Sequence, residues 1–234
     1  MRERNGQAAP WIVVTGLDGS GKSGLVETLA DALGAHRFRL PREGFVKRAL
    51  WRSGQGRPMG DVQTDRLIFA LDARLSNYEI RQWRRHHRCL VSQRGWTDNF
   101  VFGAVQGVSY EDTDRLLHVA ELERPSAWIH LVADPDVAFE RIRHDPDRDK
   151  YETRRFMRRQ YEETVRLYEA IQAPTPVLAP LHDAPAILID TTALSPDDVA
   201  HAAGAFLARV DDCAALAGGE GWTAPRREVA SARA

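Results

Sequence analysis

Gly16-Leu17-Asp18-Gly19-Ser20-Gly21-Lys22-Ser23 is the stretch that decides the fold. It fits the pattern G-x-x-x-x-G-K-[ST], the phosphate-binding P-loop, in which backbone N–H groups surround phosphate oxygens. The run 11–15 before it is apolar and β-branched, which predicts a buried strand. Apolar residues after it recur at helical spacing until Gly34, which predicts a helix over 23–33. The loop therefore lies at a helix N-terminus, where the helix dipole favours an anion.

The motif assigns roles to single residues. Lys22 can reach the β- and γ-phosphates of ATP, and the Ser23 hydroxyl can ligate Mg²⁺. A carboxylate at Asp18 can hold an acceptor group or help to position Mg²⁺ through water, although aspartate beside glycine is also a common turn former. The expected ATP-binding residues are Gly16, Gly19, Ser20, Gly21, Lys22, Ser23 and Gly24.

Composition narrows the class of protein. A chain of 234 residues suits one α/β domain, expected over 10–214 with flexible tails at 1–9 and 215–234. A net charge of −1 gives no reason to expect nucleic acid or a membrane surface as a partner. Cys89 and Cys213 are too few for a disulfide framework or a zinc site. With no long apolar run and no signal-peptide pattern, a soluble cytoplasmic protein is expected.

Short apolar runs alternate with helical patterns along the chain. Strands are expected at 11–15, 36–40, 89–93, 127–132 and 186–190. Helices are expected at 23–33, 61–86, 98–105, 111–123, 135–143, 151–173 and 196–210. This alternation indicates an α/β fold with a parallel sheet covered by helices on both faces. Residues 173–185 contain four prolines, so a loop is expected there.

Two charged features beyond the loop are candidates for ligand binding. Arg94 follows the strand 89–93, so it is expected at the carboxyl edge of the sheet, where open α/β sheets bind ligands. Its guanidinium can grip a phosphate, although a surface arginine at a strand end is the simpler alternative. The charged segment 141–150 can close over a nucleotide, with a lid at about 143–152, or remain a solvated loop. The basic run 83–88 is interpreted as a solvated helix end.

These residues together resemble the thymidylate kinase family of P-loop kinases, from about residue 11 to about residue 210. Asp18 falls on the acidic position of the family's G-x-D-G-x-G-K-[ST] loop. Leu40-Pro41-Arg42-Glu43 looks like the Arg-Glu-Pro segment after the second strand. The stretch 67–74 looks like the Leu-Phe-Ala-x-x-Arg helix, and Gln93-Arg94-Gly95 lies on the Asp-Arg-Tyr signature.

The resemblance implies a fold, cofactors and site residues. The fold would be a five-stranded parallel sheet flanked by helices, with a mobile lid; ATP, Mg²⁺ and usually a homodimer are also implied. Phe69 would pack on the acceptor base, and Arg94 would hold the acceptor phosphate. The implied catalytic residues are Asp18, Lys22, Arg94, Arg143 and Arg148, with Arg141 as a weaker lid candidate. The implied substrate-binding residues are Asp18, Arg42, Phe69, Arg74, Arg94, Asn99 and Gln106.

Three positions depart from the family's pattern. Gln93 replaces the signature aspartate, and a neutral amide holds Mg²⁺ less strongly than a carboxylate. Gly95 replaces the signature tyrosine, whose ring shapes the sugar pocket. Ala73 stands where the family arginine is expected, and Arg74 is rotated from that place by about 100° because a helix has about 3.6 residues per turn. The donor side is intact, therefore, while the acceptor side is altered.

Three functional hypotheses follow. The leading one is a kinase that transfers the γ-phosphoryl group of ATP to dTMP or a related or modified (deoxy)nucleoside monophosphate. The alternative is a kinase for a hydroxyl of a nucleoside or another small molecule, such as an antibiotic or a biosynthetic intermediate, with Asp18 as the base. A nucleotide-binding regulator without transferase activity is disfavoured because Lys22 and Ser23 are intact.

Overall fold

The computed structural model describes residues 8–42, 62–144, 153–173 and 175–216. Five parallel strands form one sheet in the order β2-β3-β1-β4-β5. Their bounds are β1 Trp11–Gly16, β2 His36–Arg39, β3 Leu90–Gln93, β4 Ala127–Val132 and β5 Ala186–Asp190. β1 is central and fully buried, and it leads directly into the P-loop. The expected α/β fold with a five-stranded parallel sheet is confirmed.

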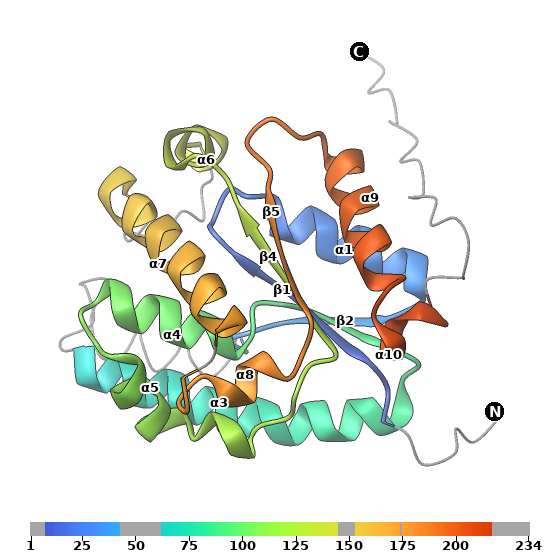
Figure 1. Cartoon of the computed structure of the whole chain (residues 1–234), viewed down its shortest axis with the longest axis horizontal. Coiled ribbons are helices and arrows are strands. Elements are labelled where there is room, and N and C mark those ends of the chain that lie inside the picture. Colours follow the sequence, from blue (N-terminus) through green and yellow to red (C-terminus); the bar gives the residue numbers. More distant parts are fainter. Residues whose placement is uncertain (1–7, 43–61, 145–152, 174, 217–234) are drawn as a thin grey trace.

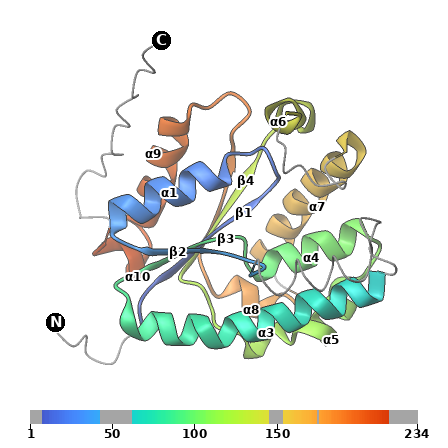
Figure 2. The same ribbon diagram turned by 180° about the vertical axis from the view of Figure 1, so that it is seen from behind.

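Helices cover both faces of the sheet, as Figures 1 and 2 show. α1 and α9 lie on one face, and α3, α4 and α7 lie on the other. The helices are α1 Lys22–Leu33, α3 Val62–His86, α4 Trp96–Val105, α5 Tyr110–Leu117, α6 Pro135–Ile142, α7 Arg154–Gln172, α8 Ala179–His182, α9 Pro196–Leu207 and α10 Asp211–Ala214, with a 3-10 turn η1 at Val119–Glu121. In the part of the chain that the structure describes, no helix is long and apolar enough to cross a membrane.

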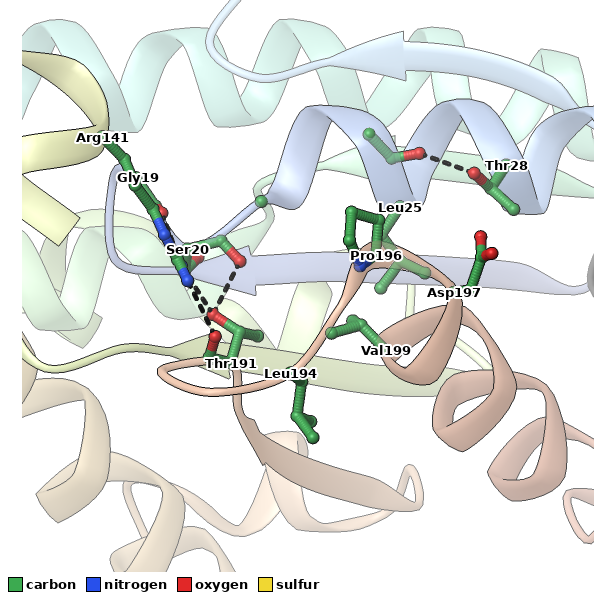
Figure 3. A pocket seen from close by; sticks show the side chains of 12 residues that line it. Gly19, Ser20, Leu25, Thr28, Arg141, Thr191, Leu194, Pro196, Asp197 and Val199 are labelled. Carbon is green, nitrogen blue, oxygen red and sulfur yellow. Dashed lines mark hydrogen bonds between the residues drawn. The ribbon is translucent and has the colours of Figure 1, made fainter. Parts of the chain in front are cut away.

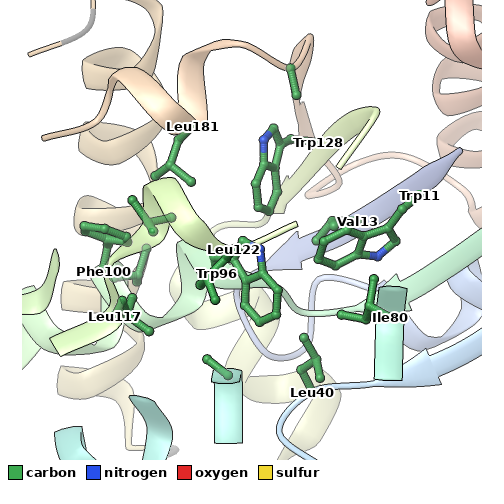
Figure 4. Close-up of a cluster of buried hydrophobic side chains, with 14 of the residues drawn as sticks. Trp11, Val13, Leu40, Ile80, Trp96, Phe100, Leu117, Leu122, Trp128 and Leu181 are labelled. Atoms are coloured by element: carbon green, nitrogen blue, oxygen red, sulfur yellow. The ribbon is translucent and has the colours of Figure 1, made fainter. Parts of the chain in front are cut away.

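The two-residue period of β1 divides the core between these layers. Trp11 and Val13 face the cluster formed with α3, α4 and α7, whereas Ile12 and Val14 face the cluster formed with α1 and α9. In the first cluster Trp11 meets Trp96 edge to face, with ring centroids 5.3 Å apart (Figure 4). The packing of aromatic rings there fixes β1 against α4, and so fixes the two segments that carry the site described below.

The element bounds correct several expectations. α4 begins at Trp96 rather than at 98, and the helix expected over 111–123 ends at Leu117 because His118 adopts a left-handed conformation (φ 48°). The proline-rich segment 173–185, expected to be a loop, contains the short helix α8. The tails expected at 1–9 and 215–234 lie mostly outside the described residues, but the Ala9 N–H donates to the carbonyl of Arg84 at 3.0 Å.

Candidate active site

Two glycines of the P-loop are required by close backbone contacts. Gly16 has φ +123°, and a Cβ there would lie 1.9 Å from the carbonyl oxygen of Leu131. Gly19 has φ +79°, and a Cβ there would lie 2.3 Å from the carbonyl oxygen of Ala138. Both conformations disfavour L side chains, so only glycine allows the loop to lie against β4 and α6. The loop then turns into α1 through Gly21, and no side chain caps the first N–H groups of this helix.

Charged side chains from three elements converge beside the loop. Lys22, at the start of α1, donates from Nζ to Asp18 Oδ1 at 3.0 Å and to the Leu17 carbonyl at 2.7 Å. Arg94, directly after β3, donates from Nη2 to both carboxylate oxygens of Asp18, at 3.0 and 3.2 Å. Asp18 therefore bridges the P-loop lysine and the arginine of the neighbouring strand. The structure thus brings together Asp18, Lys22 and Arg94, as the sequence predicts.

This arrangement keeps the Asp18 carboxylate ionised. Burial by itself raises the pKa of Asp18, but the charges of Lys22 and Arg94 outweigh it and hold the pKa well below its usual value. Burial also lowers the pKa of the Lys22 ammonium, and the Asp18 carboxylate opposes that shift. Asp18 is therefore a hydrogen-bond acceptor and a negative charge at neutral pH.

Two side-chain oxygens that could ligate Mg²⁺ lie at the start of α1. The exposed Ser23 hydroxyl donates to Gln93 Oε1 at 3.3 Å, so the amide that replaces the signature aspartate contacts the P-loop serine. Hydroxyl and amide oxygens are ligands that a hard cation accepts, with phosphate oxygens and water completing its shell. The residues present therefore fit Mg²⁺ held jointly with a triphosphate. Within the described ranges, no group of three or more His, Cys, Asp and Glu side chains is arranged to hold a metal ion on its own.

A cavity of about 350 Å³ borders the P-loop and extends to the loop between β5 and α9 (Figure 3). Its size is within the range of small-molecule sites. Arg141 of α6 lines one end, where it donates to the Gly19 carbonyl at 3.3 Å and to the Thr191 carbonyl at 3.0 Å. Leu194 and Pro196 supply apolar surface at the other side (Figure 3). The cavity thus offers an apolar slot beside the phosphate loop.

Two arginines connect α3, α4 and the end of β3 to aromatic rings. Arg66 lies over the Phe69 ring at 5.2 Å and donates from Nη1 to the Asn99 carbonyl at 3.1 Å. The Arg94 guanidinium lies 5.7 Å from the centre of the Phe102 ring. Phe69 and Asn99, two of the implied substrate-binding residues, therefore both contact Arg66, Asn99 through its backbone carbonyl. Arg66 itself was not singled out from the sequence.

Several expected site residues have other partners in the structure. Arg74 Nη1 lies 2.9 Å from Glu121, so an acceptor contact by Arg74 requires that ion pair to break. Arg42 pairs with Glu79 at 3.1 Å. Arg143 pairs with Glu140 one helical turn earlier. Arg148 and most of the expected lid lie outside the described residues. The roles of these residues stay predictions.

Gln106 is the C-cap residue that follows α4, and its backbone N–H donates to the carbonyls of Phe102 and Gly103. Its side-chain oxygen is buried and has no hydrogen-bond partner among the described residues. Its contact with a base also stays a prediction.

Two further features near Arg94 were not expected. Asp98 on α4 is buried, and its Oδ1 lies 3.9 Å from Arg94 Nε. Asp98 is the first residue of the helix expected over 98–105, and nothing in that pattern distinguishes it from other acidic residues. At Gly95, a Cβ would lie 2.7 Å from Val13 Cγ1 and 2.9 Å from Trp128 Cζ3. Core side chains therefore fill the space where the signature tyrosine would begin.

Two curated relatives of this chain carry the same name. A curated relative from Pyrobaculum aerophilum, named as a probable thymidylate kinase, is 29% identical over 171 residues, which cover 72% of this chain and 86% of that protein. A second, from Pyrobaculum calidifontis and with the same name, is 30% identical over 153 residues, 64% of this chain and 77% of that protein. No family model matches the chain.

Solved structures with the same fold include two nucleotide and nucleoside kinases. Thymidylate kinase from Candida albicans aligns with a TM-score of 0.70 at 15% identity, over 88% of this chain and 93% of that one. Deoxyadenosine kinase from M. mycoides with bound dATP aligns with a TM-score of 0.61 at 14% identity, over 82% and 96%. At these identities the likeness shows the architecture, and the site must be argued from its own residues.

Proposed function

This chain belongs to the thymidylate kinase family and is an ATP-dependent nucleotide kinase, and from that premise we propose that its acceptor is dTMP or a closely related or modified deoxynucleoside monophosphate. The observation that carries the proposal is the bridge Lys22–Asp18–Arg94. It joins the P-loop to the guanidinium of Arg94, directly after β3, the strand beside β1 in the sheet. An anion-binding arginine so close to the P-loop fits an acceptor that itself carries a phosphate.

On the donor side, the P-loop amides and Lys22 would bind the ATP phosphates, and the base would lie in the cavity between the loop and Pro196. Arg141 already joins Gly19 to Thr191 and would keep the two walls of this slot together. Ser23, with Gln93 beside it, would hold Mg²⁺. When bound, Mg²⁺ neutralises charge on the phosphate oxygens.

On the acceptor side, Arg94 would exchange one anion for another. Its Nη2 group contacts Asp18, and an acceptor phosphate would replace that carboxylate as its partner. Asp18 would then be held by Lys22 alone and face the acceptor as an ionised hydrogen-bond acceptor. Phe69, held by Arg66, would supply the flat surface on which the base stacks.

Phosphoryl transfer by this site requires positioning and charge stabilisation rather than covalent catalysis. The attacking oxygen belongs to the acceptor phosphate, which needs no strong base at neutral pH. Lys22 and Arg94 lie on either side of Asp18 and would stabilise the negative charge that is shared between donor and acceptor in the transition state. The lid arginines Arg143 and Arg148 would add to this stabilisation when ATP is bound.

Kinetics with a set of acceptors test the proposal. Purified protein is assayed with ATP, Mg²⁺ and dTMP, dUMP, dCMP, AMP or thymidine. We expect dTMP or another pyrimidine deoxynucleotide to be the best acceptor. Lys22→Ala should lower kcat by about a thousandfold or more, since it removes a preorganised charge from the transition state. Arg115→Ala, on an exposed face of α5, is the matched control and should leave kcat unchanged.

Arg94→Ala separates the leading function from the alternative. It should reduce turnover of monophosphates far more than that of thymidine, because only the former place a phosphate on Arg94. Equal losses for both, with thymidine the better substrate of the wild-type protein, would favour a hydroxyl kinase. Undiminished turnover in Lys22→Ala would remove the assignment altogether.

We also propose that the protein is a homodimer that packs through α3. Four of the six large hydrophobic side chains that are exposed among the described residues lie on one stripe of this helix: Leu67, Leu71, Leu75 and Tyr78. They are three or four residues apart and so share one face. Leu71→Glu should shift the sedimenting species from dimer to monomer. Leu194→Glu, an exposed leucine away from α3, should not. A monomeric wild-type protein would refute the proposal.

A further inference from the structure

Arg94 has an unusual backbone conformation that its neighbours enforce. Its φ of 69° lies in the left-handed region, which a non-glycine residue adopts only when its surroundings determine it. Its N–H donates to the Val14 carbonyl at 2.8 Å, and its carbonyl accepts from the Ser92 hydroxyl at 3.0 Å. Ser92 Oγ in turn accepts from the Trp11 indole at 2.9 Å. The backbone of Arg94 is thus fixed to β1.

A buried carboxylate lies behind the side chain of Arg94. Asp98 Oδ2 accepts from the Thr15 hydroxyl at 2.6 Å and from the Gly95 N–H at 2.9 Å. Its other oxygen, Oδ1, lies 3.9 Å from Arg94 Nε. Asp98 is only 8% exposed. The guanidinium therefore lies between two carboxylates, with Asp18 at its Nη2 end and Asp98 at its Nε side.

Capping the start of α4 does not by itself require a charged side chain. A neutral amide side chain, such as glutamine, can also accept a hydrogen bond from the N–H of the N-cap residue when it stands at this third helical position. A buried carboxylate is costly unless a cation and hydrogen bonds compensate it. Here Arg94 is that cation, while Thr15 and Gly95 supply the hydrogen bonds. The charge of Asp98 thus interacts with the guanidinium as well as with the start of α4.

We propose that Asp98 is a positioning residue for acceptor binding: it holds the Arg94 guanidinium from the Nε side so that its Nη groups face Asp18 and, in the complex, the acceptor phosphate. The inference rests on the proposed function in one respect, namely that Arg94 binds that phosphate. When the phosphate takes the place of Asp18, Asp98 is the carboxylate that keeps the arginine in place. Gln93, which directly precedes Arg94, is neutral and contacts Ser23 instead.

Asp98→Asn tests the charge separately from the cap. The amide oxygen can still accept from Gly95 and Thr15, so the melting temperature should stay within about 3 °C of the wild type. We expect the KM for dTMP to rise about five- to tenfold, because the carboxylate 3.9 Å from Arg94 Nε is replaced by a neutral amide and its coulombic attraction is lost. The KM for ATP should stay within about twofold. Asp98→Ala removes both the cap and the charge and should lower the melting temperature as well.

A double-mutant cycle identifies the partner. In an Arg94→Met background, Asp98→Asn should have no further effect on the KM for dTMP, because the residue it acts through is gone. Additive effects, or equal changes in the KM for ATP and for dTMP, would overturn the proposal. An unchanged KM for dTMP in the single variant would overturn it too.

One readout does not depend on the identity of the acceptor. In ¹⁵N NMR spectra of the ligand-free protein, the Arg94 Nε–H signal, assigned by its loss in Arg94→Met, should be sharp in the wild type. In Asp98→Asn it should be broadened or lost. If the wild-type protein phosphorylates no monophosphate, the proposed function fails, and this spectrum still decides whether Asp98 positions Arg94. An unchanged signal in Asp98→Asn refutes the positioning role.

Discussion

Gly95→Ala is expected to destabilise the protein through packing alone. The residue has φ −159°, an extended conformation that any amino acid adopts, so the backbone contributes no strain. The added Cβ would instead lie 2.7 Å from Val13 Cγ1 and 2.9 Å from Trp128 Cζ3. Both neighbours are fully buried, and Val13 belongs to the central strand. Neither can move without displacing other core side chains, because protein interiors are close-packed.

The size of the effect follows from these contacts. Overpacking of a well-filled core costs about 1–3 kcal/mol. For a chain of this length, 1 kcal/mol corresponds to roughly 2–4 °C in melting temperature. We therefore expect Gly95→Ala to melt about 2–12 °C below the wild type, with a matching loss in urea denaturation.

A second glycine provides the matched control. Gly24 lies in the first turn of α1, and a Cβ there meets nothing within 4 Å. Gly24→Ala should raise the free energy of unfolding by about 0.5–1 kcal/mol, because alanine favours the helix. The double variant Gly95→Ala/Val13→Ala should be less destabilised than the sum of its single variants, since it relieves the clash. If Gly95→Ala melts within 1 °C of the wild type, or the double variant is additive, the packing argument fails.

Three further predictions concern charge. Compared with Gln93→Asn, Gln93→Asp should need about fivefold less Mg²⁺ for half-maximal activity, because a carboxylate near Ser23 holds the ion better than an amide of the same length. Equal Mg²⁺ titrations of the two variants would contradict this. Burial and the positive charges nearby lower the pKa of His36, whose ring stacks on His87 with centroids 4.2 Å apart. The native state therefore binds a proton at His36 less well than the unfolded state, and the free energy of unfolding should fall as the pH drops below about 6.5. His36→Gln should flatten that fall when stability is measured by urea denaturation at several pH values. Burial raises the pKa of Asp72 to about 6, so the native state binds a proton there better than the unfolded state. The free energy of unfolding should therefore fall as the pH rises from about 4 to 6. Asp72→Asn should remove this slope, and an unchanged slope would show that Asp72 titrates normally.

Local signals predicted the fold well, and long-range contacts account for the differences. The buried strands and the P-loop helix follow from periodicity and glycine placement alone. The break at His118 and the helix α8 do not, because both depend on how the chain packs after α5 and α7. The strand order β2-β3-β1-β4-β5 likewise requires knowing which strands pair. The residue pattern predicted five strands and a parallel sheet, and the family resemblance implied the same five-stranded sheet.

The site residues that lie in a motif or at a strand end could be predicted from the sequence, whereas those defined by long-range contacts could not. Asp18, Lys22 and Arg94 lie at strand ends or inside the motif, where sequence position alone places them at the binding edge. Asp98 and Arg66 look in the sequence like ordinary charges on helices. Only the contacts of Asp98 with Thr15, and of Arg66 with Phe69 and Asn99, distinguish them.

Gln93 and Gly95, the two residues that depart from the Asp-Arg-Tyr signature, have different surroundings and therefore different consequences. At position 95 the core leaves no room, because Val13 and Trp128 occupy the space of a side chain; any change in the acceptor pocket there follows from packing. At position 93 the amide contacts Ser23, so the change acts on the donor and metal side. Arg94 stands between the two and keeps its place through β1 and Asp98. Arg94 thus keeps a left-handed backbone conformation between two carboxylates, which is the kind of strain found at functional sites, and this supports the proposal that it binds the acceptor phosphate.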